Sequence, residues 1–138
     1  MDDIFAQIPD VLSKLGIIPR DISLYQTACI HRSFLNESPE GITAHNERLE
    51  FLGDAVLELI ATEFLYKTYD HPEGELTNFR SALVNYKMLS DIAARLQFEQ
   101  YLLMSRGEAK DTGRARQVIL ANCIEAFIGA LYLDMGYD

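Results

Sequence analysis

Residues 46–57 carry acidic side chains within one of the most apolar stretches of the chain. At the period of an α-helix, Glu47, Glu50 and Asp54 fall at positions i, i+3 and i+7 on one face. We therefore predict one long helix over residues 46–69 with an acidic side. Its other side carries the apolar positions expected to face the core, namely Leu49, Leu52, Val56, Leu57, Ile60, Phe64 and Leu65.

The acidic face of this helix has two interpretations. Stacked carboxylates repel one another and partial burial raises that cost, so such a face is either well solvated or occupied by a cation. A row of acids taken alone is more often a solvated surface. Gly53 favours the second interpretation, because a glycine inside a helix costs stability and often marks close packing against another segment.

The rest of the 138-residue chain also has helical periodicity, and no segment alternates with period two over a useful length. With a hydrophobic fraction of 49%, this predicts an all-α fold in one domain, residues 1–138. We expect Pro9 to break a first helix over residues 3–15, Asp21 to cap a second, and Gly136 to end the last. Residues 34–44 and 104–113 are expected to be surface loops.

Charge and cysteine content limit which partners and which compartment we expect for the protein. A net charge of −9 argues against nucleic-acid binding, except where acids are gathered to hold divalent cations beside a local basic rim. The acidic N-terminus does not resemble a secretory signal, and no apolar run is long enough to span a bilayer. We expect a soluble cytoplasmic protein without a membrane partner, in which Cys29 and Cys123 are buried thiols with no disulfide partner and no zinc.

A second polar pair lies in the apolar segment over residues 118–132. Asn122 and Glu125 are spaced i, i+3 on one face of this predicted central helix and need polar partners. They could bond to the end of a neighbouring helix. Alternatively, they could face Glu50 and Asp54 in an oxygen-rich cluster of the kind that Mg²⁺ prefers. The spacing alone leaves both alternatives open.

The sequence Asn-Glu-Arg-Leu-Glu-Phe-Leu-Gly-Asp over residues 46–54 resembles the signature of ribonuclease III endonuclease domains of the bacterial type. The resemblance implies an all-α, two-fold symmetric homodimer that cleaves double-stranded RNA during RNA processing. It implies Mg²⁺ as cofactor, with Mn²⁺ able to substitute, and products with 5′-phosphates and short 3′ overhangs. It extends over nearly the whole chain, through His31-Arg32-Ser33, Glu73-Gly74, Arg106-Gly107-Glu108 and residues 119–130.

Residue by residue, the resemblance makes Glu50, Asp54 and Glu125 catalytic metal ligands, with Asn122 at the fourth ligand position. It makes Phe51 a knob that inserts into the partner subunit, whereas periodicity alone allows Phe51 to be ordinary core. The residues implied to bind RNA or organise the site are Glu47, Glu73, His31, Arg32, Ser33 and Arg106. Further candidate phosphate contacts are Arg48, Arg80, Lys87, Lys110, Arg114 and Arg116.

Asn122 departs from the family pattern, where an aspartate is usual. Its amide still offers an oxygen to a metal but removes a negative charge, so Mg²⁺ should bind less tightly. We expect an active enzyme, with an attenuated or engineered-inactive site as the alternative. Two other functions stay open: a non-catalytic RNA-binding or assembly scaffold, and a metal-dependent nucleotide phosphohydrolase. No double-stranded-RNA-binding domain is expected within residues 1–138, so RNA affinity should be weak and salt-dependent.

Overall fold

A computed structural model describes residues 5–36, 44–110 and 113–137. Those residues form no strand, and one isolated bridge pairs Ile30 with Leu103. The all-α prediction is confirmed. In chain order the helices are α1 (Ile8–Lys14), α2 (Ile22–Ala28), the 3-10 helix η2 (Arg32–Asn36), α3 (Glu47–Thr68), α4 (Glu73–Leu83), α5 (Tyr86–Arg95), the 3-10 helix η3 (Phe98–Tyr101), α6 (Arg106–Lys110) and α7 (Arg114–Met135).

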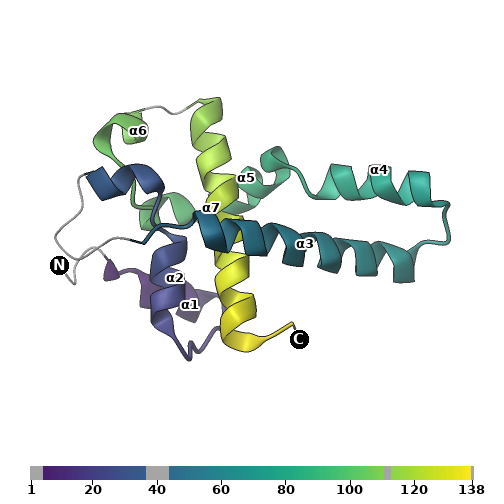
Figure 1. Cartoon of the computed structure of the whole chain (residues 1–138), viewed down its shortest axis with the longest axis horizontal. Coiled ribbons are helices and arrows are strands. Elements are labelled where there is room, and N and C mark those ends of the chain that lie inside the picture. Colours follow the sequence, from purple (N-terminus) through teal and green to yellow (C-terminus); the bar gives the residue numbers. More distant parts are fainter. Residues whose placement is uncertain (1–4, 37–43, 111–112, 138) are drawn as a thin grey trace.

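The helix α7 runs through the middle of the molecule, and α2, α3 and α5 pack around it (Figure 1). Its sequence explains this position, because a helix that is apolar on most faces must be covered on most faces. Both cysteines are buried and free, and the Sγ of Cys123 lies 3.6 Å from the carbonyl oxygen of Ala28 in α2. The predicted buried thiols are therefore confirmed.

By length and composition, α7 is the one helix in the described part of the chain that could cross a membrane. This corrects the expectation that no segment is long enough, since the helix reaches that length with Glu125 and Asp134 among its apolar residues. In the most apolar 18-residue stretch of this helix, 56% is buried inside the fold. Its position in the core accounts for its apolar composition.

The helices α3 and α4 form a hairpin that projects away from the helices gathered around α7 (Figure 1). With 22 residues, α3 is roughly 33 Å long, so its second half extends beyond the core. The predicted core stripe is correct for Leu49, Val56 and Leu65, which are buried. It is wrong for Ile60 and Phe64, which are 42% and 53% exposed because they lie on the projecting half.

Individual residues determine where several helices begin or end. Asp21 caps α2 by accepting a hydrogen bond from the Ser23 amide at 3.0 Å, and Gly136 follows α7 with φ of +82°, both as predicted. Pro9 does not break a helix; it lies in the first turn of α1, where no amide hydrogen is needed. The region expected as a loop over residues 104–113 contains α6, and η2 occupies the start of the predicted loop 34–44, of which residues 37–43 lie outside the described part.

Candidate active site

The acidic turns of α3 lie directly against the middle of α7. Asn46 fixes the start of α3, because its side-chain amide donates to the carbonyl oxygen of Ala28 at 3.1 Å and its backbone amide donates to Ile30. Gly53 then allows the two helix backbones to approach, since a Cβ at this position would overlap the carbonyl oxygen of Glu125. The close packing expected from this glycine is therefore present.

This crossing creates one cleft of about 510 Å³ between the two helices. The structure thus brings the two predicted polar pairs together, Glu50 with Asp54 from α3 and Asn122 with Glu125 from α7. Their role as metal ligands stays a prediction. The residues lining the cleft are Glu47, Glu50, Phe51, Asp54, Asn122 and Glu125.

Crowding of carboxylates dominates the electrostatics of this cleft. Burial, a hydrogen bond with Asp54 and the negative charges of Asp54, Glu50 and Glu58 raise the pKa of Glu125 to about 8. Burial also raises the pKa of Glu50, with smaller contributions from the charges of Glu47 and Asp54. Each shift has the same meaning: placing a further negative charge here is unfavourable unless a proton or a cation offsets it.

The chemistry of the donors fits a hard divalent cation, because the polar side chains of the cleft end in carboxylate and amide oxygens. Across the described residues, no three His, Cys, Asp or Glu side chains are already placed to coordinate one ion directly. Mg²⁺ usually keeps several of its waters and takes only one or two carboxylates directly. The cleft would therefore hold Mg²⁺ partly through water, with Glu50, Asp54, Asn122 and Glu125 as the donors.

Phe51 lies at the rim of the cleft with 84% of its surface exposed. The interpretation of Phe51 as ordinary core of this protomer is therefore wrong. An aromatic ring exposed to this degree between acidic residues costs free energy unless another surface covers it.

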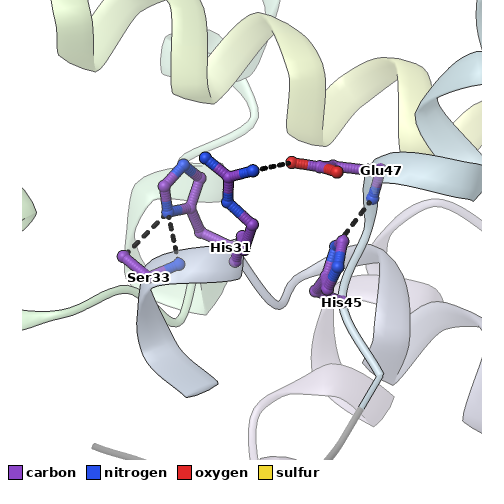
Figure 2. A network of polar contacts seen from close by, with 5 residues as sticks. His31, Ser33, His45 and Glu47 are labelled. Carbon is purple, nitrogen blue, oxygen red and sulfur yellow. Dashed lines mark hydrogen bonds and ion pairs between the residues drawn. The ribbon is translucent and has the colours of Figure 1, made fainter. Parts of the chain in front are cut away.

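The residues His31 and Ser33 lie near Glu47 at the start of α3 (Figure 2). The Arg32 guanidinium pairs with the Glu47 carboxylate at 3.5 Å, while the Nδ1 atom of His31 contacts Ser33. These predicted site residues therefore adjoin the acidic edge of the cleft. Their contact with RNA stays a prediction.

Glu73 is not near this cleft in the protomer. It is the first residue of α4, beyond the far end of α3, and lines a separate pocket of about 850 Å³ together with Tyr66, Tyr69, Thr77 and Arg80, among others. The expectation that Glu73 belongs to the acidic surroundings of Glu50 and Asp54 does not hold within one protomer, because the length of α3 separates them.

Among the basic candidates, the structure separates accessible from buried groups. Arg106 is exposed at the start of α6. Arg116 is not available to a phosphate, because it is buried, pairs with Glu99 and donates to the carbonyl oxygen of Ala109 at 2.5 Å. The sequence analysis did not predict that Arg116 would be buried. The available signal was that Arg116 shares a helical face with buried Ile119.

Comparison with known proteins shows which family the chain is similar to. A family model described as ribonuclease-III-like matches residues 21–138. The chain is 48% identical over 135 residues to Ribonuclease 3 of Chloroflexus aurantiacus and 43% identical over 129 residues to Ribonuclease 3 of Streptococcus gordonii, covering 96% and 93% of this chain. It spans only 55% and 56% of the length of these two relatives.

Solved structures show the same fold. A nuclease domain of ribonuclease III from Campylobacter jejuni, described for structural flexibility in the region involved in dimer formation, aligns with a TM-score of 0.82 at 37% identity. The alignment covers 94% of this chain and 87% of that one. The sequence match and the shared fold agree, and the chain belongs to the ribonuclease-III-like family.

Proposed function

We propose that residues 1–138 are the catalytic domain of a Mg²⁺-dependent endoribonuclease that cleaves double-stranded RNA as a homodimer in the cytoplasm, in the processing of RNA. The observation that carries this proposal is the cleft in which Glu50, Asp54, Asn122 and Glu125 converge from two helices. Free, buried cysteines fit a reducing compartment.

Four polar residues of the cleft, Glu50, Asp54, Asn122 and Glu125, would hold Mg²⁺ against the substrate phosphate. When bound, Mg²⁺ supplies a water of lowered pKa for in-line attack and offsets the charge that builds on the phosphoryl and leaving 3′ oxygens. Glu125 would have to release its proton to hold the cation, because burial and the neighbouring carboxylates raise its pKa to about 8. No side-chain nucleophile is needed, so His31, His45 and His71 are not assigned as bases.

The RNA backbone would approach the cleft from its basic side. Arg32 is 71% exposed in its side chain although it pairs with Glu47, and Arg106 is exposed on α6. Because A-form RNA presents phosphates and 2′-hydroxyls across a shallow minor groove, such contacts recognise shape more than sequence. Binding by this domain should weaken steeply as salt increases.

The homodimer would form through the exposed apolar face of α3. Phe51, Leu59 and Tyr66 are 84%, 55% and 78% exposed, and their spacing of eight and seven residues places them on one face of the helix. Ile60 and Phe64 are also exposed, but at helical spacing they fall on a different face of α3. A second copy of this chain is the occupant that we propose, because the related Campylobacter jejuni domain was described through its dimer-forming region.

A comparison of substrates tests this function. At low salt with Mg²⁺, the protein should cleave long double-stranded RNA while leaving single-stranded RNA and free nucleotides intact. Hydrolysis of nucleotides without cleavage of RNA would indicate the phosphohydrolase instead. Tight RNA binding by a folded dimer that cleaves nothing would indicate the scaffold. The matched variant Glu125→Gln keeps the size of the side chain and should remove cleavage.

A further inference from the structure

Asn46 is a buried polar residue, with 3% of its surface exposed, immediately before the first residue of α3. At this position an asparagine usually caps the helix with its side-chain oxygen, but the side chain of Asn46 makes no such bond. The amide of Glu47 instead donates to the Nδ1 atom of His45 at 3.4 Å (Figure 2). Capping of α3 therefore does not account for the burial of an asparagine here.

The side chain of Asn46 bonds to a different helix. Its Nδ2 atom donates to the carbonyl oxygen of Ala28, the last residue of α2, at 3.1 Å. The last carbonyl groups of a helix lack a partner within that helix, so this oxygen can accept a donor from outside. Because Ala28 is completely buried, leaving its carbonyl without a good donor would cost free energy.

The same carbonyl oxygen of Ala28 is also contacted from α7. The Sγ of Cys123 lies 3.6 Å from it, in the helix that carries Asn122 and Glu125. A thiol is a weak donor, so the amide of Asn46 is the stronger partner. One buried oxygen of α2 therefore joins the start of α3 to the middle of α7, the two helices whose side chains converge in the cleft.

Glu50 lies between two points at which α3 is attached. Gly53, where α3 crosses α7, follows Asn46 by seven positions, which is about 10 Å along a helix. The carbonyl oxygen of Asn46 accepts from the Glu50 amide at 2.8 Å, in the first turn. A helix held at one crossing can still turn about that point, and a second attachment removes this freedom. The orientation of Glu50 therefore depends on how Asn46 is held.

Two other contacts hold the start of α3, and neither fixes its rotation. The backbone amide of Asn46 donates to the carbonyl oxygen of Ile30 at 2.9 Å, which restrains one point of the chain. Leu49 is buried on the core side, but apolar contact is not directional. The side-chain bond to Ala28 adds a second directed bond from the same residue to a different acceptor. Two such bonds restrain the rotation of the first turn as well as its position.

We propose that Asn46 is a positioning residue for the candidate metal cluster: through the Ala28 carbonyl it fixes the rotation of the first turns of α3 against α7, and so places Glu50 opposite Asn122 and Glu125. Asn46 acts through Glu50, because it is buried and does not line the cleft. This role rests on the proposed function, since it concerns the same cleft and the same cation.

Asn46→Ser tests this role while preserving the start of the helix. Serine ranks with asparagine as an N-cap residue and adds no charge, but its shorter side chain should not reach Ala28. One hydrogen bond typically shifts an equilibrium by about fivefold. Once this bond is lost, Mg²⁺ itself must hold Glu50 in place, so half-saturation should need roughly fivefold more Mg²⁺. Titration with Mg²⁺ alone, followed by the amide resonances of Asn122 and Glu125, measures this change.

Tyr25→Phe is the matched control. It also removes one buried hydrogen bond of α2, from the Tyr25 hydroxyl to Asp134 at 2.7 Å, near the end of α7. Both variants should stay folded and lose similar stability in chemical denaturation, but Tyr25→Phe should bind Mg²⁺ like the wild type. An unchanged Mg²⁺ requirement in Asn46→Ser, an equal rise in both variants, or a wild type that binds no Mg²⁺ would overturn the proposal.

Cleavage of RNA separates misplaced donors from a loss of folded protein. The rate of Asn46→Ser should return to that of the wild type as Mg²⁺ is raised, with KM for RNA unchanged, because all of its donors are present. A lower rate at every Mg²⁺ concentration with unchanged half-saturation would indicate a merely structural residue and contradict the proposal. If no protein cleaves RNA while the difference in Mg²⁺ binding persists, the positioning role stands and the proposed endoribonuclease activity fails.

Discussion

Gly53 of α3 and Gly129 of α7 face one another where the two helices cross. At neither position is there room for a Cβ atom beside the backbone of the other helix. A Cβ on Gly129 would overlap the carbonyl oxygen of Leu49 and lie 3.1 Å from the Gly53 nitrogen. A Cβ on Gly53 would overlap the carbonyl oxygen of Glu125. This contact brings Asp54 to Glu125, so the cleft depends on two residues that have no side chain.

Gly53→Ala should therefore destabilise the fold and disrupt the cleft together. Overpacking against a backbone atom cannot be relieved by a rotamer change, and we expect a loss of about 3 kcal/mol in the free energy of unfolding. Chemical denaturation measures this loss. Gly74→Ala is the matched control, because its Cβ would meet nothing within 4 Å and its stability should be unchanged or slightly higher. Equal stability of the two variants would contradict this account of the crossing.

The raised pKa of Glu125 predicts how the stability of the metal-free protein depends on pH. The folded state holds the Glu125 proton up to about pH 8, whereas the unfolded state releases it near the ordinary value of 4.5. The folded state therefore binds more protons between these values, and stability must fall as pH rises from about 4.5 to 8. Thermal melts in a chelating buffer should show this decline, and Glu125→Gln should flatten it.

The proton on Glu125 should be released when Mg²⁺ binds. Calorimetric titrations in two buffers of different ionisation enthalpy should give release approaching one proton at pH 7, because the cation favours the ionised carboxylate. The Mg²⁺ affinity should rise with pH over the same interval in which stability falls. Binding without proton release would show that Glu125 is not among the donors.

Asn122→Asp should lower the Mg²⁺ concentration needed for half-maximal activity. Two unit charges about 4 Å apart attract by roughly 1 kcal/mol in water and more near a protein surface, so an added carboxylate should gain at least roughly 2 kcal/mol with a divalent cation, which corresponds to more than about tenfold. Without metal the same variant should be less stable, since a further carboxylate would join Glu50, Asp54 and Glu125. An unchanged metal requirement would exclude Asn122 as a donor.

Phe51→Ala should weaken the homodimer. A buried aromatic residue at the centre of an interface often contributes 2 kcal/mol or more, so we expect a rise of roughly thirtyfold or more in the dimer dissociation constant by sedimentation. Alanine favours the helix, so the protomer should stay folded. Ile18→Ala is the control, because Ile18 is 85% exposed but precedes α2, away from α3. Dimerisation that is unaffected by Phe51→Ala would exclude this face.

Periodicity predicted α3 and α7 well because long apolar stripes have a definite helical period, and Gly53 indicated their close approach. It did not predict that Ile60 and Phe64 would be exposed in the protomer, since an apolar stripe does not say whether the surface that covers it belongs to the same chain. The sequence did not predict the short polar helix α6, because the Glu108 amide donates to the Ser105 side chain and Arg116 donates to Ala109, and such bonds leave no periodic pattern.

The sequence predicted only some residues of the candidate site correctly. The family resemblance marked Glu50, Asp54 and Glu125, and the fold places them together. The resemblance assigned Glu73 to the same surroundings, although the long helix predicted over residues 46–69 already places Glu73 beyond its far end; in the structure this helix is roughly 33 Å long.

The most direct test of the central claim is cleavage of long double-stranded RNA across a Mg²⁺ titration, comparing the wild type with Glu125→Gln. The wild type should release products with 5′-phosphates and short 3′ overhangs at a rate that saturates with Mg²⁺. The variant should be folded and dimeric but slower by at least about 100-fold, because it loses a carboxylate that would hold the cation. Equal cleavage by both proteins, or cleavage by neither at saturating Mg²⁺ and low salt, would contradict the assignment of catalysis to this cleft.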